Sequence, residues 1–166
     1  MRVYVPATSG MLRALARDGE LGPPPVTAFA VTPGLREYYV DDDLEELEYA
    51  ASSEAARASL RLLDADEASA RRRVVVSADV ADSAVQIRDD LDLGVVRVET
   101  AIRLQWCAAV HVDDAEAEAT VAIAARSIDA ADLGEPDAED RVDDSEGFEL
   151  SWYATQELPD LLVELG

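Results

Sequence analysis

The feature that most constrains the fold of this chain is a long amphipathic segment between Asp41 and Leu63. Its apolar residues recur at spacings of three and four, which places them on one face of a helix: Leu44, Leu47, Ala51, Ala55, Ala58 and Leu62. Three aspartates, Asp41 to Asp43, precede the stripe, where carboxylates cap free N–H groups and suit the positive end of the helix dipole. Capping accounts for these aspartates, so we expect no metal site there. A helix with one apolar face must pack on other apolar elements.

Valine-rich runs elsewhere in the chain predict the strands that this helix covers. The predicted strands are 2–7, 26–31, 74–80, 95–99, 107–112 and 148–153. Shorter helices are predicted after Thr8, after Thr32-Pro33, from Asp113 or Asp114 to Arg126, and over 157–165. This order predicts one α/β domain over 1–166, with a mixed, partly parallel sheet of about six strands and flanking helices. The alternative is a two-layer α+β sandwich of ferredoxin-like type.

Two polar segments interrupt these elements. Residues 81–94 are predicted to form a polar loop. Residues 129–147 hold nine acids, one arginine, two glycines and a proline, a composition typical of an acidic mobile loop. Their spacing does not match a calcium-binding loop.

The charge of the chain narrows its possible partners. There are 36 acidic residues against 14 basic ones, a net charge of −22, and every basic residue is an arginine. A field of this sign repels nucleic acid and anionic membranes, so neither is expected as a partner. Arg71 to Arg73 are therefore interpreted as counter-charges to nearby acids. No apolar run approaches the ~20 residues that span a bilayer, and the N-terminal residues do not resemble a secretory signal, which favours a cytoplasmic location.

Few residues offer catalytic chemistry. His111 is the only histidine, and it shares the expected face of its strand with Asp113, so these two residues are the weak catalytic candidates. Cys107 is the only cysteine and lies in an apolar run, where a small buried side chain is favoured over a nucleophile. The chain lacks the Gly-x-Ser-x-Gly, Walker, Gly-x-Gly-x-x-Gly and His-Glu-x-x-His motifs. No cofactor is expected.

A second group of candidates lies where the last strand meets the last helix. Trp152, Tyr153, Gln156 and Glu157 concentrate aromatic and polar side chains at a strand-to-helix junction, a common place for ligand sites in α/β sheets. The competing interpretation is structural, with Trp152 buried against the closing helix. We favour burial, so truncating Trp152 should be costly and neutralising Glu157 should not.

Several segments together resemble a family of uncharacterised proteins from high-GC Gram-positive bacteria. The segments that carry this resemblance are MRVYVPAT, LGPPPVTAFAVTPGLREYY, EELEYAA, ARASLRLL, RRRVVVSADV, AAVHVDDAEAE and WYATQELPDLL. They span nearly the whole chain except the two polar segments. The resemblance implies a bacterial cytoplasmic origin, and it transfers no functional residue because the family has no assigned activity.

These observations favour a non-enzymatic acidic cytoplasmic protein that acts through protein–protein contacts. The alternative is a small carboxylate-based enzyme that works with or without a divalent cation. A third reading is an acidic decoy that mimics nucleic acid for a basic partner. A cleft holding two or more inward-pointing acids would favour the enzyme, and the sequence leaves that question open.

Overall fold

The computed structural model describes residues 1–40 and 42–166, and its centre is an open β-sheet. Seven strands lie in the order β5-β6-β3-β1-β4-β8-β9, and every printed neighbour pair is antiparallel. The strands are β1 (Arg2–Ala7), β3 (Val26–Phe29), β4 (Val74–Asp79), β5 (Val85–Ile87), β6 (Val95–Val98), β8 (Cys107–Asp113) and β9 (Leu150–Tyr153). A separate ribbon pairs β2 (Glu20–Leu21) with β7 (Ile102–Arg103).

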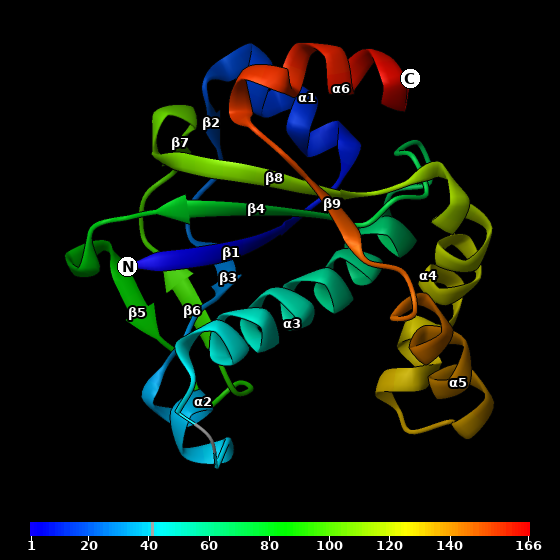
Figure 1. Ribbon diagram of the computed structural model, residues 1–166, viewed down its shortest axis with the longest axis horizontal. Coiled ribbons are helices and arrows are strands. Elements are labelled where there is room, and N and C mark those ends of the chain that lie inside the picture. Colours follow the sequence, from blue (N-terminus) through cyan, green and yellow to red (C-terminus); the bar gives the residue numbers. More distant parts are fainter. Residues whose placement is uncertain (41) are drawn as a thin grey trace.

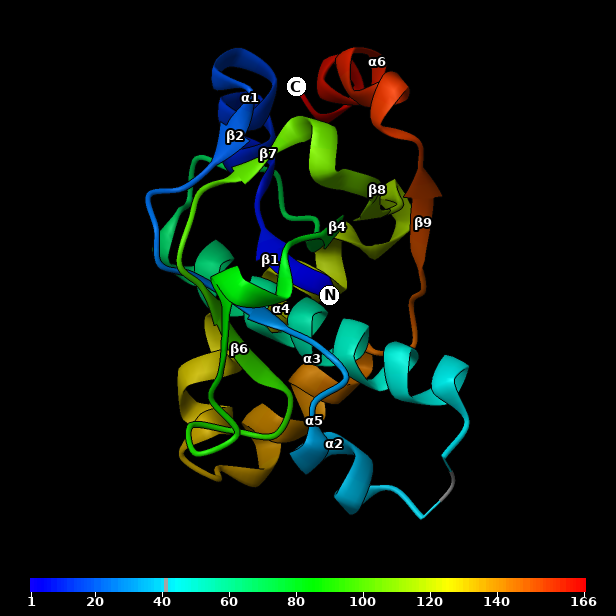
Figure 2. The same ribbon diagram turned by 90° about the vertical axis from the view of Figure 1, so that its left-hand side faces the viewer.

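Helices cover both faces of this sheet (Figure 1). On one face lie α1 (Ser9–Asp18) and α6 (Leu158–Leu165), and on the other lie α2 (Pro33–Tyr38) and the long α3 (Leu44–Ala65). The hairpin of α4 (Glu118–Asp132) and α5 (Pro136–Ser145) packs against the C-terminal part of α3 through Leu60 and Leu63. Figure 2 shows β9 at the outer edge of the sheet, opposite the β5–β6 side. Among the described residues, none of the helices combines the length and apolar character needed to cross a membrane.

The helix caps predicted at Thr8, Thr32 and the aspartates before α3 are confirmed, but the cap predicted at Asp113 or Asp114 is wrong, because α4 begins after Ala117 without a side-chain cap. The Thr8 hydroxyl accepts a hydrogen bond from the Met11 amide, and Gly19 ends α1 in the left-handed region at φ 77°. The Thr32 hydroxyl caps α2 by accepting a hydrogen bond from the Leu35 amide. The Asp43 carboxylate caps α3 by accepting one from the Glu45 amide. The first aspartate of the predicted cap, Asp41, lies outside the described residues.

The mixed α/β class is confirmed, but the prediction of a partly parallel sheet of about six strands is wrong. Helix α3 does carry the chain across the sheet, because β3 and β4 both run antiparallel to β1 and are therefore parallel to each other. However, β1 lies between them, so the crossover is a split β–α–β unit with no parallel neighbours. The α4–α5 hairpin runs out and back, so β9 pairs antiparallel with β8. With helices on both faces, the two-layer alternative is not matched either.

The two predicted polar loops also hold regular structure. Residues 129–147 are not a loop: they contain the end of α4 and the whole of α5, whose Ala138 and Val142 are buried against α4. Pro136 stands in the first turn of α5, where a missing N–H costs nothing. Residues 81–94 contain the short edge strand β5. The acidic composition did not indicate α5, because a surface helix needs apolar residues on only one side.

One buried serine ties the long helix to the sheet. The Ser59 hydroxyl on α3 donates to the Ala7 carbonyl at 2.8 Å and accepts from the Val74 amide at 3.1 Å. Ala7 and Val74 are register partners at the end of β1 and the start of β4. This contact fixes α3 over the sheet, and the polar residues of α3 are thereby held in place.

Candidate functional site

Two hollows that share lining residues lie along α3. The inner hollow, about 490 Å³, lies between α3, the start of β4, β8 and the segment that enters β9. Its lining includes Ser52, Ser53, Ala56, Arg57, Arg73, His111, Phe148, Glu149 and Leu150. The outer hollow, about 530 Å³, lies between the end of α2 and the first half of α3. It is lined by Tyr39, Asp43, Glu45, Glu46, Tyr49, Ala50, Ser53 and Glu54.

The two hollows form one continuous surface, which we call the α3 track. Tyr49, Ser53 and Glu54 line both hollows. At the junction between them, the Tyr49 hydroxyl donates to Glu149 Oε1 at 3.0 Å, which links α3 to the residue before β9. The pKa of Tyr49 is raised chiefly by this hydrogen bond, so the hydroxyl stays protonated and can donate.

The wall of the inner hollow is built on a buried ion pair. Arg73 donates to both carboxylate oxygens of Asp113 at 2.8 Å, and the Arg73 amide also donates to Asp113 at 2.8 Å. Both side chains are almost fully buried. The Arg73 guanidinium also donates to the Phe148 carbonyl at 3.0 Å, which fixes the segment that joins α5 to β9. The prediction that the arginine triplet offsets acids is confirmed for Arg73 and for Arg72, which pairs with Glu118 and Glu164.

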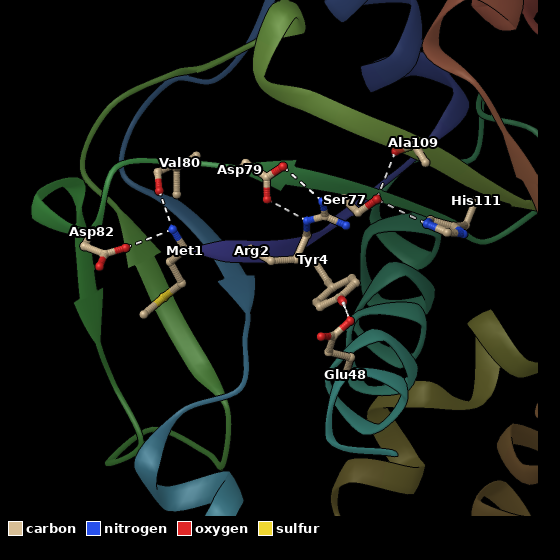
Figure 3. Close-up of polar contacts among 10 residues, drawn as sticks. All are labelled: Met1, Arg2, Tyr4, Glu48, Ser77, Asp79, Val80, Asp82, Ala109 and His111. Carbon is tan, nitrogen blue, oxygen red and sulfur yellow. Dashed lines mark hydrogen bonds and ion pairs between the residues drawn. The ribbon is translucent and has the colours of Figure 1, made fainter. Parts of the chain in front are cut away.

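This ion pair removes Asp113 from any dyad with His111. Instead, His111 Nε2 lies 3.3 Å from Ser77 Oγ on the neighbouring strand (Figure 3). Burial lowers the pKa of His111, and the positive charge of Arg2 lowers it further. The predicted His–Asp dyad is therefore wrong, because the carboxylate is fully engaged by Arg73.

The Ser77–His111 pair does not have the arrangement of a nucleophile and its base. Ser77 is only 1% exposed, so its hydroxyl cannot meet a substrate in this structure. The hydroxyl also lies within 3.4 Å of the Ala109 carbonyl, to which it donates. In the contact between Ser77 and His111, the tautomer of the ring decides which group donates. The pair serves as a polar link between β4 and β8.

Two further polar contacts involve side chains of β1, near the N-terminus of the chain (Figure 3). The Tyr4 hydroxyl donates to Glu48 on α3 at 3.2 Å, and Arg2 holds Asp79 with two hydrogen bonds of 2.7 and 3.0 Å. Burial and the neighbouring Glu48 charge raise the pKa of Tyr4 to about 12. Tyr4 is therefore a fixed donor that helps to hold the first half of α3.

The outer hollow differs in character, because its side chains are exposed, acidic and aromatic. Five of the twelve large hydrophobic side chains that are exposed in the described residues lie between Tyr38 and Tyr49: Tyr38, Tyr39, Val40, Leu44 and Tyr49. The side chain of Tyr38 is 68% exposed and that of Tyr49 is 58% exposed. The rings of Tyr38 and Tyr39 meet edge to face at 5.2 Å. Aromatic groups held in water in this way contribute little to the fold.

The fold disfavours the ionised form of Glu54, which lies in this region. Desolvation raises the pKa of its carboxyl, and the nearby negative charge of Asp92 raises it further. The positive charges of Arg57 and Arg61 offset part of this rise. Glu54 lies on the wall shared by the two hollows, so a cation bound there would lower the pKa of its carboxyl further.

None of the C-terminal candidates lines either hollow, although Trp152 is the register partner of His111 and shares its face of the sheet. Trp152 is 61% exposed on edge strand β9, so the prediction that it is buried is wrong. Tyr153 packs instead against the α1–α6 core. Gln156 is exposed, and Glu157 accepts a hydrogen bond from the Ala154 amide at 2.7 Å. A binding role for Trp152, Tyr153, Gln156 and Glu157 stays a prediction.

Both hollows are lined by more than one acid, Glu54, Glu146 and Glu149 in the inner one and Asp43, Glu45, Glu46 and Glu54 in the outer one, so the carboxylate enzyme keeps a structural basis. Within 1–40 and 42–166, no three His, Cys, Asp or Glu side chains are placed so that they could hold a metal ion. Burial raises the pKa of the Cys107 thiol to about 11, which keeps the thiol protonated at neutral pH and agrees with its interpretation as an inert side chain. The carboxylate enzyme stays a prediction from the sequence.

Sequence reasoning missed the residues that make the outer hollow distinctive. Tyr49 stands outside the apolar stripe of α3, two residues after the buried Leu47. Tyr38 and Tyr39 close a short helix in which only Leu35 is buried. Large apolar residues off the buried stripe of a helix are a signal that a sequence can give.

Comparison with known proteins places the chain in a family. A family model described as "Family of unknown function (DUF6912)" matches residues 1–162, so the chain belongs to this family. The resemblance seen in the sequence is thereby confirmed at the level of an uncharacterised family. Neither the curated proteins nor the solved structures contain a match to this chain.

Proposed function

We propose that this protein acts in the cytoplasm as a non-enzymatic docking protein, and that its partner protein binds along the α3 track. The observation that carries the proposal is the exposure of Tyr39 and Tyr49 in the lining of the outer hollow, with the exposed Tyr38, Val40 and Leu44 close to them in the sequence. Monomeric proteins rarely hold large apolar side chains together in water unless the patch binds something. Tyrosine is also among the residues that contribute most to protein–protein binding.

Shape supports the same surface. The two hollows adjoin and together run from the end of α2 to the start of β9. Their walls are fixed by buried contacts, because Ser59 holds α3 and the Arg73–Asp113 pair holds the entry to β9. A preorganised surface loses little conformational entropy when a partner binds.

Charge supports a protein partner over nucleic acid or an anionic membrane. The net charge of −22 opposes close approach of polyanions at ordinary salt. The same field accelerates encounter with a partner that presents basic residues.

The proposal is tested by photo-cross-linking in the native host. A benzophenone amino acid replaces Tyr49 in one strain and Asp140, an exposed acid on α5, in a matched strain. We expect one defined protein to be captured from position 49 and not from position 140. The purified protein should then bind the wild type and bind Tyr39→Ser/Tyr49→Ser more weakly. Equal capture at both positions, or binding that ignores the double substitution, would refute the α3 track as the docking surface.

A further inference from the structure

We infer that the α3 track takes a segment of the partner with two features: a basic side chain for the outer hollow and an apolar side chain for the inner hollow. This inference rests on the proposed docking function and adds the chemistry of the segment. It follows from the different linings of the two hollows and from the residues that they share.

The outer hollow is suited to a cation. Its two rings, Tyr39 and Tyr49, are exposed, and its other charged lining residues are all carboxylates: Asp43, Glu45, Glu46 and Glu54. No arginine is among its described lining residues. An arginine or lysine from a partner gains both from the ring faces and from these four carboxylates, of which Glu54 also feels the charges of Arg57 and Arg61. The aromatic rings are the independent feature, because acids alone occur over much of this surface.

The inner hollow is suited to an apolar side chain. Ala56, Phe148 and Leu150 supply apolar lining, and Phe148 and Leu150 are partly exposed. Its charged lining is mixed, because Arg57 and Arg73 stand there with the carboxylates of Glu54, Glu146 and Glu149, and both arginines already have acidic partners, so this hollow lacks the unbroken acidic lining of the outer one. Apolar contact is the interaction that this lining favours for an uncharged side chain.

Because the two hollows share a wall, one segment of the partner can place a side chain in each of them. Tyr49, Ser53 and Glu54 border both hollows, so one short segment can reach both without leaving the surface. A second copy of this chain is a poor occupant, because each copy carries a net charge of −22. Complementary charge therefore favours a different protein with a basic residue near an apolar one.

The experiment is an NMR titration of the full chain with synthetic probe peptides. The probes are capped peptides with one arginine and one leucine separated by one to four glycines, and matched peptides carry glutamine for arginine or serine for leucine. We expect at least one arginine–leucine probe to give saturable amide shifts at Tyr39, Tyr49 and Phe148. Both matched peptides should bind more weakly.

Substitutions of the protein separate a built site from general attraction. Tyr49→Ser should weaken the probe about two- to fivefold, the range expected for loss of one cation–aromatic contact, while Tyr49→Phe should retain binding. Asp140→Asn/Asp144→Asn on α5 removes two exposed acids and should leave the site of the shifts unchanged. Shifts that spread evenly over the acidic surface, an equal response to the glutamine peptide, or no saturable binding would each overturn the inference. A partner captured at Tyr49 whose docking segment lacks a basic residue would overturn it and leave the docking function standing.

Discussion

The first half of α3 and the whole of α5 both have acidic surfaces, but they differ in the other side chains that they expose to solvent. Helix α5 exposes Asp137, Glu139, Asp140, Asp143 and Asp144, and none of its residues is an exposed large hydrophobic. Helix α3 exposes Glu45 and Glu46 together with Leu44 and Tyr49. Acidic residues are common throughout this chain, so they distinguish no region. The exposed aromatic side chains distinguish α3, and they are the reason for proposing it as the docking surface.

The largest expected effect concerns the buried Arg73–Asp113 pair. Asp113→Ala leaves Arg73 buried without its carboxylate and releases the contact that holds the Phe148 carbonyl. We expect a loss of about 3–5 kcal/mol in the free energy of unfolding, measured by urea denaturation. Asp114→Ala, at the exposed neighbour, should cost less than about 1 kcal/mol. Similar losses for both variants would show that the inner hollow does not depend on this pair.

The next prediction compares the stability lost on truncating a buried and an exposed side chain of α3. Leu47→Ala opens a cavity beneath the helix, where Leu47 is 1% exposed, and should cost about 2–5 kcal/mol. Tyr49→Ser changes a side chain that is mostly in water and should cost less than about 1 kcal/mol in thermal or urea unfolding. If Tyr49→Ser destabilises the chain as much as Leu47→Ala, the tyrosine is structural and the contrast with α5 disappears.

Local signals in the sequence predicted much of this structure, and the failures share a physical cause. The caps at Thr8, Thr32 and Asp43 and the strand positions depend on neighbours in sequence, and they are confirmed. Sheet order depends on how far each connection carries the chain, which periodicity does not contain. The insertion of β1 between β3 and β4 therefore could not be read from the order of elements.

The site was predicted less well than the fold, because burial depends on neighbours far away in sequence. Trp152 carries the residue type of a core anchor but faces water on an edge strand, so Trp152→Ala should now cost less than about 1 kcal/mol. Asp113 shares a face with His111, as expected, but its carboxylate binds Arg73, which directly precedes β4. Only Tyr49, off the apolar stripe, could have been identified from the helix pattern alone.

Salt should affect stability moderately, and mostly through regions such as α5. The ion pairs of the described residues involve eight of the 14 arginines and nine of the 36 acids, the N-terminal pair with Asp82 included. Between ~20 and ~500 mM sodium chloride the Debye length falls from about 20 Å to about 4 Å, so the melting temperature should rise. A flat or falling curve in calorimetry would mean that the acids do not repel one another.

A matched substitution locates part of that repulsion. The last turn of α5 has no basic residue and ends beside Asp143 and Asp144, at the negative end of the helix dipole. Asp144→Asn should stabilise the chain by about 0.3–1 kcal/mol at low salt, and the gain should shrink at high salt. A gain that is independent of salt would assign the effect to something other than charge.

The smallest effect is the pH dependence of Glu54. Because desolvation raises the pKa of this carboxyl in the fold, its ionisation destabilises the folded state. That cost develops as pH rises from the ordinary range of a glutamate through the raised pKa, and it is constant above. Glu54→Gln should therefore be slightly more stable than the wild type at pH 7 and equal to it at acidic pH, measured by paired urea titrations. An advantage of the glutamine variant that persists at low pH would contradict this cause.

The most direct test of the central claim is carboxyl footprinting of the protein in native lysate and after purification. Carbodiimide labelling compares acids of the outer hollow, Glu45 and Glu46, with acids of α5, Asp140 and Asp144, in the same molecule. All four are exposed in the isolated chain, so they should react once the protein is pure. We predict that Glu45 and Glu46 are protected in the lysate while Asp140 and Asp144 are not. Equal labelling of all four in the lysate, or protection confined to α5, would contradict the assignment of the α3 track as the docking surface.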